Sequence, residues 1–236
     1  MENKNLKISL NWSIIKGLLI LALPILAGNL LQSSYQFVDA YWVGKVGKEA
    51  VAAVSVSGPI TFLIVALGTW FAMAGTILVA QYAGAGKKEL VNHSAAQTLL
   101  SVVVISLLLS IIGFFAAESI LQIMGVAPEV MHYALPYLQT TFCGLIFTFI
   151  FSMFQSILRG VGEVNIPLYI ILSTVLLNFV IDPMFILWFG PIPSMGPQGA
   201  AIATLITQGI SAGIWLWILF RGKHGIKLNR SDFKPD

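Results

Sequence analysis

Six long apolar segments constrain the fold of this chain more than any other feature of its sequence. They cover residues 17–42, 50–80, 91–116, 133–158, 165–189 and 199–220. Each is long enough to cross a hydrocarbon layer of about 30 Å as a helix. Their hydrophobicity is continuous rather than alternating, which favours helices over the strands of a membrane barrel. The sequence therefore predicts an all-α integral membrane protein, built as a six-transmembrane-helix bundle.

The composition agrees with this class and excludes several others. Hydrophobic residues make up 57% of the 236 residues and charged residues only 10%, whereas about a quarter of a soluble domain is charged. The single cysteine, Cys143, cannot form an intramolecular disulfide, and the three histidines lie too far apart for a zinc-binding spacing. We expect one membrane domain over residues 1–236, with residues 221–236 as a basic cytoplasmic tail or linker. We expect no cofactor and no nucleic-acid partner.

The basic residues predict the orientation of the bundle. With six spans, 11 of the 13 lysines and arginines fall on the side of the N-terminus and 2 on the other side. The 11 are Lys4, Lys7, Lys16, Lys87, Lys88, Arg159, Arg221, Lys223, Lys227, Arg230 and Lys234. Because basic loops stay in the cytoplasm, both termini are predicted to be cytoplasmic, in a multi-pass protein of the inner (plasma) membrane of the cell.

Two carboxylates lie inside the apolar segments and are the first candidates for function. Asp39 is near the end of the first segment and Asp182 near the end of the fifth. A carboxylate in a bilayer is costly, so it normally faces a bundle interior or a wet cavity and marks an ion or proton path. The plainer interpretation, that each aspartate only bonds a neighbouring helix, explains one aspartate better than two.

Depth estimates add two more residues to this site. At 1.5 Å per residue, Asp39 lies about 33 Å along its helix and Asp182 about 26 Å along its own, both in the outer half. Thr204 lies only about 8 Å below the outer end of the sixth helix. Asn178 precedes Asp182 by four residues and shares its helix face. Such oxygen ligands suit Na⁺ or a shared proton, whereas softer metals prefer sulfur or imidazole.

Further residues are weaker candidates for a transport function. Gln36, Tyr137 and Gln139 are candidates for lining a cavity, although hydrogen bonds between helices explain them about as well. Pro24 and Pro183 are expected to bend their helices, because proline removes a backbone donor and distorts the preceding turn. At Pro183 this can free the carbonyl of Phe179 toward the same cavity as Asp182.

A series of short motifs resembles the N-terminal half of the multidrug and toxic compound extrusion (MATE) family. The order and spacing of these motifs are similar to the family's across nearly the whole chain. They are Leu23-Pro24, Val38-Asp39-Ala40 with Val43-Gly44, residues 81–86 (QYAGAG), residues 158–163 (LRGVGE) with Pro167, residues 178–183 (NFVIDP) and residues 196–204 (GPQGAAIAT).

The resemblance implies an antiporter that exports diverse, often cationic organic compounds in exchange for Na⁺ or H⁺. It also implies an N-lobe cation site made by Asp39, Asn178, Asp182 and Thr204. Family members usually have twelve helices in two six-helix lobes, so the resemblance implies a partner, either a second lobe or a second copy of this chain. The sequence does not distinguish a fragment from a natural half-size transporter, nor Na⁺ coupling from H⁺ coupling.

Two other functions are alternatives to drug efflux. A lipid-linked oligosaccharide flippase of related fold is the stronger alternative, but its cavity should hold lysine or arginine for a pyrophosphate, and no basic residue lies deep in a segment. An intramembrane aspartic protease would use the two aspartates as a dyad. Such proteases carry a Gly-x-Gly-Asp motif, whereas Gln36-Phe-Val precedes Asp39 and Phe179-Val-Ile precedes Asp182. The sequence therefore predicts a transporter and not an enzyme.

Overall fold

Six long helices make up almost all of the described structure, a computed structural model that describes residues 14–188, 194–222, 226, 228 and 230–233. No strand occurs in these residues. The helices are α2 (Ile14–Gly44), α3 (Lys48–Gly84), α4 (Lys88–Ile123), α5 (Pro128–Gly160), α6 (Asn165–Pro183) and α7 (Pro197–Arg221). Each is long and apolar enough to cross a membrane. The all-α class and the six-helix architecture are confirmed.

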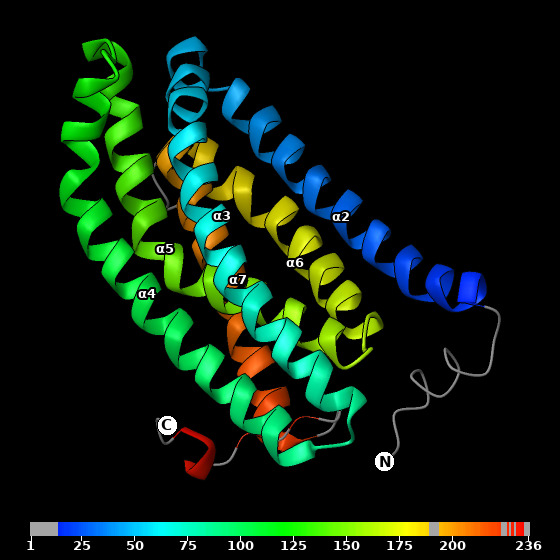
Figure 1. Cartoon of the computed structure of the whole chain (residues 1–236). Coiled ribbons are helices and arrows are strands. Elements are labelled where there is room, and N and C mark those ends of the chain that lie inside the picture. The colour runs from blue at the N-terminus through cyan, green and yellow to red at the C-terminus, as the bar shows by residue number, and fades with distance from the viewer. Residues whose placement is uncertain (1–13, 189–193, 223–225, 227, 229, 234–236) are drawn as a thin grey trace.

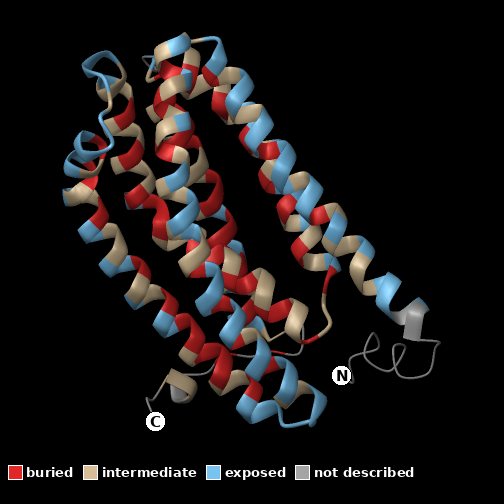
Figure 2. Cartoon of the chain, turned by 45° about the horizontal axis from the view of Figure 1, so that its top comes forward, coloured by how far each residue is buried: buried red, intermediate tan, exposed pale blue. Residues whose placement is uncertain are grey.

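The helices form an antiparallel bundle around α5 (Figure 1). Helices α3, α4 and α7 all pack on α5, and α2 packs mainly on α6. Buried residues face the middle of the bundle, whereas α2 is exposed along much of its length (Figure 2). We call the end with the α3–α4 turn, which carries Lys87 and Lys88, the basic end, and the end with the α2–α3 turn the opposite end. Helix α2 begins and α7 ends at the basic end (Figure 1).

All of the helices except α6 extend beyond the apolar segments from which they were predicted. The segment predicted at residues 91–116 is a helix from Lys88 to Ile123. Its 36 residues are about 54 Å long at 1.5 Å per residue, well over the hydrocarbon thickness. Hydropathy finds only the part of a helix that lies in lipid, so the polar turns at either end were missed.

The fifth predicted span is not one regular α-helix. Helix α6 ends at Pro183, and the chain continues as a π-helical turn over Met184–Trp188. The reason is local, because Pro183 has no N–H to continue the α-helical ladder. Residue 189, the last of the predicted segment, lies outside the described residues.

The described part of residues 221–236 packs back onto the basic end. Ile226 and Leu228 are buried, and the N–H of Leu228 donates to the carbonyl of Leu219 on α7 at 3.3 Å. A short 3-10 turn, Arg230–Phe233, lies beside α4, where Gln97 Nε2 donates to the carbonyl of Asp232 at 3.3 Å. This segment, which was predicted as a tail or linker, therefore closes part of one end of the bundle.

Glycines bring neighbouring helices close to the aromatic side chains of α5. A Cβ at Gly113 on α4 would lie 1.9 Å from Phe142, and one at Gly68 on α3 would lie 2.5 Å from Phe149. Small residues at helix contacts of this kind are how membrane helices gain packing energy without a hydrophobic driving force. The close packing of α3, α4 and α5 leaves the looser contacts of the bundle to α2 and α6.

Candidate functional site

The four predicted ion-site residues come from three helices that meet in the half of the bundle toward the opposite end. Asp39 is on α2, Asn178 and Asp182 are on α6, and Thr204 is on α7. Asn178 Nδ2 donates to Asp182 Oδ1 at 2.8 Å, and both residues are fully buried. The four-residue spacing thus places the amide and the carboxylate in direct contact, one turn apart on one face.

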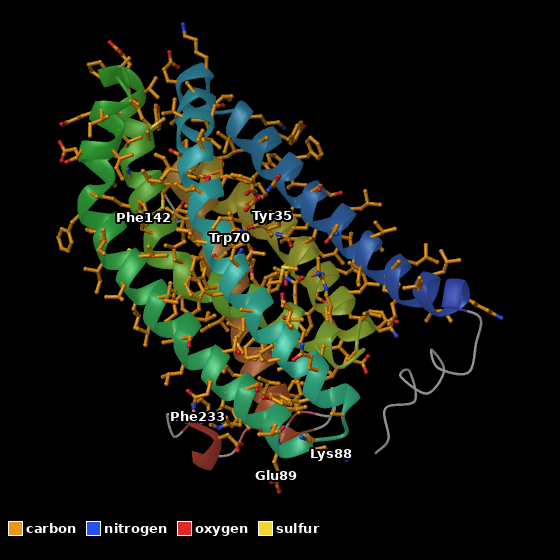
Figure 3. The ribbon with its side chains drawn as sticks, in the orientation of Figure 1. Tyr35, Trp70, Lys88, Glu89, Phe142 and Phe233 are labelled. Carbon is orange, nitrogen blue, oxygen red and sulfur yellow. The ribbon has the colours of Figure 1, made fainter. Side chains whose placement is uncertain are left out.

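Helix α2 brings two side chains to this part of the bundle. The carboxyl group of Asp39 lies close enough to that of Asp182 for the two groups to interact electrostatically. One turn earlier, the hydroxyl of Tyr35 hydrogen-bonds Thr204 Oγ1 on α7. Tyr35 lies between α2 and α6 in Figure 3. The structure therefore brings Asp39, Asn178, Asp182 and Thr204 into one polar cluster.

Three oxygen atoms of this cluster are buried without a hydrogen-bond donor among the described residues. They are Asp39 Oδ1, Asn178 Oδ1 and Asp182 Oδ2. Leaving a buried acceptor unpaired costs about 1–3 kcal/mol, and more when the group is charged. A cation could pair with all three and a shared proton with two of them, and oxygen ligands of this kind fit Na⁺. The chemistry of the donor set therefore matches a hard cation or a proton.

The residues predicted to line a cavity lie in different environments. Tyr137 of α5 is close enough to Asp39 for electrostatic interaction and thus borders the acidic cluster. Gln139 of the same helix is half-buried, and Gln36 of α2 is exposed. Of the three, only Tyr137 is placed near the cluster, by its electrostatic interaction with Asp39. The lining role of all three stays a prediction.

The two prolines differ in their visible effect. Pro24 lies inside α2, which continues as an α-helix from Ile14 to Gly44. Pro183 follows Asp182 directly and marks the change from α- to π-helix. Past this change, the carbonyls of Phe185 and Ile186 accept hydrogen bonds from Met195 and Gly196 at 3.1 and 3.2 Å. The irregular backbone next to Asp182 is thus held by the chain that leads into α7.

Polar side chains continue from the cluster toward the basic end. Thr174, one turn before Asn178, hydrogen-bonds Ser211 of α7 at 2.7 Å. Gln208 of α7 bonds Thr148 of α5. Sequence reasoning missed these residues and Tyr35 as site members. The signal for two of them was available, because Tyr35 lies four residues before Asp39 and Thr174 four before Asn178, each on its partner's helix face.

The interior cavity beside this polar column is small. It has a volume of about 10 Å³ and is lined by Gln32, Tyr35, Phe151, Ile171, Thr174, Val175 and Gln208. That is room for about one water molecule, whereas pockets for drug-sized ligands measure about 300 Å³ or more. This cavity is too small for a drug-sized molecule.

Comparison with known proteins places this architecture in a family. The family model described as MatE matches residues 24–184, which is more than half of the chain. The chain belongs to the MATE family. Members of this family are transporters rather than enzymes. The resemblance drawn from the sequence motifs is confirmed.

Individual relatives agree with this assignment. The chain is 31% identical over 215 residues to the probable multidrug resistance protein YpnP of Bacillus subtilis, covering 89% of this chain and 47% of YpnP. Crystal structures of a MATE protein in a straight and in a bent conformation both match with a TM-score of 0.85 and 27% identity. The alignments cover 93% and 94% of this chain but 48% and 49% of those chains. The chain thus spans about half the length of the relatives it matches.

Proposed function

We propose that this MATE protein forms one lobe of a multidrug efflux antiporter. The lobe exchanges diverse, often cationic organic compounds for Na⁺ or H⁺, and Asp39, Asn178, Asp182 and Thr204 hold the coupling ion. The observation that carries the proposal is the convergence of three buried, unpaired oxygen atoms from α2 and α6. The names of several relatives, which are multidrug resistance or export proteins, support efflux as the activity.

Coupling follows from competition for the same oxygen atoms. A proton on Asp182 uses the carboxylate oxygen that would otherwise bind Na⁺, so H⁺ and Na⁺ cannot both occupy the site fully. Either ion neutralises charge that is costly in a bilayer. Ion binding changes the contacts between Asp39 and Asp182, and with them the contact between α2 and α6.

Substrate access requires the interior of the bundle to open. Helix α2 is the natural element to move, because it packs mainly on α6 and is exposed along much of its length. Pro24 provides a weak point within it. Moving α2 away from α6 enlarges the cavity beside Tyr35, with Gln36, Tyr137 and Gln139 as candidate lining residues. Export then alternates with ion entry at the acidic cluster.

The proposed assembly has two bundles in the inner (plasma) membrane, with both termini of this chain in the cytoplasm. The partner is a second six-helix lobe or a second copy of this chain. The flippase alternative is less well supported, since it needs a basic cavity for a pyrophosphate. None of the seven residues that line the interior cavity is a lysine or arginine.

Efflux under an imposed ion gradient tests the proposed function. Cells that express the chain together with a second MATE lobe are loaded with a fluorescent organic cation, and its loss is followed after a step in external Na⁺ or pH. We expect efflux above that of cells without the chain, driven by at least one of the two gradients. Loss of dye at the same rate with and without either gradient would refute the antiporter.

Spin labels test whether ion binding moves α2 relative to α6. Labels are placed at Tyr41 on α2 and Val180 on α6, which are 59% exposed each, after Cys143→Ser removes the native thiol. Because the carboxyl groups that join the two helices lose mutual repulsion on protonation, we expect the interlabel distance to shift when pH or Na⁺ changes in liposomes.

A second label pair controls for unrelated changes in the membrane. Met73 on α3 and Leu108 on α4 are exposed positions on tightly packed helices, so their distance should stay constant. Identical distance distributions for the Tyr41–Val180 pair at all pH values and Na⁺ concentrations would remove the ion-driven movement from the mechanism.

A further inference from the structure

A groove outside the bundle interior has no role in the proposed transport site. It lies between α3 and α4, in the half of the bundle toward the basic end, and has a volume of about 410 Å³. It opens sideways, since Phe71 and Leu78 on its α3 wall are 45% and 46% exposed. None of its lining residues belongs to α2, α6 or α7, so it is distinct from the acidic cluster.

The two walls of the groove differ in chemistry. The α3 wall is apolar, with Phe71 and Leu78. The α4 wall is polar, with His93, Gln97 and Ser101 at four-residue intervals on one helix face. A groove with one apolar and one polar wall offers both kinds of contact to a molecule that lies in it. The groove therefore fits an amphipathic molecule better than a purely apolar one.

Close helix packing forms the floor of the groove. A Cβ at Gly75 on α3 would lie 2.2 Å from Thr98 Oγ1 on α4, so the helices touch there only because residue 75 is a glycine. The hydroxyl of Thr98 donates a hydrogen bond to the carbonyl of Ser94 at 2.7 Å. The floor is internally bonded, and the open part of the groove is lined by His93, Ser101 and Gln97, whose amide also donates to the carbonyl of Asp232 at 3.3 Å.

The length of the groove matches one leaflet of a bilayer. Its α3 wall runs from Phe71 to Tyr82 and its α4 wall from Leu90 to Ser101. Each wall is about 16 Å long at 1.5 Å per residue, against about 15 Å for half of a 30 Å hydrocarbon core. An acyl chain lying along the groove would reach from the basic end to about the midplane of the membrane.

Two lysines lie at the turn that ends the groove. The N–H of Lys87 donates to the carbonyl of Tyr82 at 2.9 Å, which fixes the α3–α4 turn at the end of the groove. Lys87 and Lys88 are exposed there, with Glu89 as the nearest acidic residue in the sequence; Figure 3 labels Lys88 and Glu89 at this turn. Two lysines at a membrane surface attract anionic headgroups and repel organic cations.

We propose that this groove binds an anionic phospholipid from the leaflet at the basic end. The phosphate lies near Lys87 and Lys88, the polar α4 wall bonds the glycerol and ester groups, and one acyl chain lies along Phe71 and Leu78. Anionic lipids are concentrated in the cytoplasmic leaflet, where the basic end is proposed to lie. The site does not depend on ion coupling and is testable apart from transport.

Lipid binding to the purified chain in detergent tests the site. Native mass spectrometry gives dissociation constants for dioleoyl phosphatidylglycerol and for dioleoyl phosphatidylcholine. We expect at least about tenfold tighter binding of phosphatidylglycerol at low ionic strength, because each lysine near the surface contributes about fivefold. Equal binding of the two lipids would overturn the proposal.

Charge variants locate the headgroup. Lys87→Gln with Lys88→Gln should weaken phosphatidylglycerol binding by about 25-fold, whereas Lys45→Gln with Lys48→Gln removes the same charge at the opposite end and should leave it unchanged. Lys87→Arg with Lys88→Arg should retain binding, which separates loss of charge from loss of structure. Equal weakening by the two glutamine pairs would place the lipid elsewhere.

A filling variant locates the acyl chain. Ala74 lines the groove and is exposed, and Ala80 is an exposed alanine on the same helix that does not line it. Ala74→Trp should weaken binding and Ala80→Trp should not, with helical content equal by circular dichroism. Equal affinity of the two variants would overturn the proposal.

Competition distinguishes other occupants of the groove. Glycerol 3-phosphate, which has the headgroup charge without chains, should not displace the lipid at matched concentration. Displacement by it indicates a site for free phosphate, and displacement by tetraphenylphosphonium indicates a substrate site. A dimer of the chain that Ala74→Trp dissociates indicates a second copy in the groove. Each of these three results would contradict a lipid site.

Discussion

Replacing Asp182 with asparagine is expected to reduce ion-driven efflux to the background of cells without the protein. Asp182 is fully buried, and its Oδ2 is one of three unpaired oxygens in the acidic cluster. Asparagine has nearly the same volume and can still accept the hydrogen bond from Asn178 Nδ2, so the fold and membrane insertion should be retained. The substitution removes the negative charge and the protonation site.

The size of the effect follows from the strength of hydrogen bonds and ion contacts to a carboxylate. Hydrogen bonds to charged groups contribute about 1.5–3 kcal/mol each, which corresponds to about 10- to 150-fold in affinity for each bond. We expect Na⁺ affinity of the site to fall by at least about tenfold and the pH dependence of efflux to disappear. The measurement is dye efflux from cells that also express a second lobe, combined with Na⁺ binding to the purified protein.

Glu118→Gln provides a matched control for this substitution. Glu118 is exposed near the end of α4, at the opposite end of the bundle, toward which the acidic cluster also lies. Its carboxylate accepts a hydrogen bond from Gln122 at 3.1 Å. The variant loses one carboxylate without touching the acidic cluster, so efflux should be unchanged. Asp39→Asn should act as Asp182→Asn does, because the two carboxyl groups face each other. Intact ion-driven efflux in both aspartate variants and in their combination would show that the coupling ion binds elsewhere.

The fold was predictable from the sequence because lipid imposes a simple rule. A helix in a bilayer needs about 20 apolar residues, and six segments satisfied that rule. The helix ends were not predictable in the same way, since Lys88 and Glu89 form the first turn of α4 although they are polar and lie outside the lipid. Hydropathy therefore does not predict where a helix ends once it has left the apolar layer.

The candidate site was predictable in its two aspartates and in two polar neighbours, Asn178 and Thr204, but not in its further hydroxyl groups. Asp39 and Asp182 stood out because their cost in a bilayer demands an explanation, and Asn178 followed from the helical period. Tyr35 and Thr174 share faces with these residues, but a buried hydroxyl needs no explanation until its partner on another helix is known. Their partners, Thr204 and Ser211, lie on α7, and the pairing of α2 or α6 with α7 is a result of tertiary packing.

The groove between α3 and α4 shows the same limit. The sequence has His93, Gln97 and Ser101 at helical spacing, a pattern that would equally suit a buried contact with another helix. Only the position of α3, set by Gly75 against Thr98, leaves this stripe open to the side. Helix faces can be predicted from spacing, whereas the neighbour of each face depends on how the whole bundle packs.

The largest effect expected of all is that this chain, expressed by itself, does not export drugs. Alternating access needs two bundles that move against each other around a site at their interface. The described residues form one bundle, and the chain spans about half the length of the relatives it matches. With an even number of helices, a second lobe of the same kind would have the same orientation, the parallel type of repeat.

Co-expression separates the two kinds of partner. Cells with this chain alone should lose a fluorescent cation at the background rate, and cells that also express a second MATE lobe should lose it faster. Crosslinking in the same membranes, through the exposed thiol of Cys143 and through lysines, reports whether the chain pairs with itself. A crosslinked homodimer with efflux from the chain alone would contradict the prediction, because two identical lobes would then form the complete transporter. Restored efflux only with the second lobe would mean that this six-helix bundle supplies the ion site and its partner supplies the other half of the transport path.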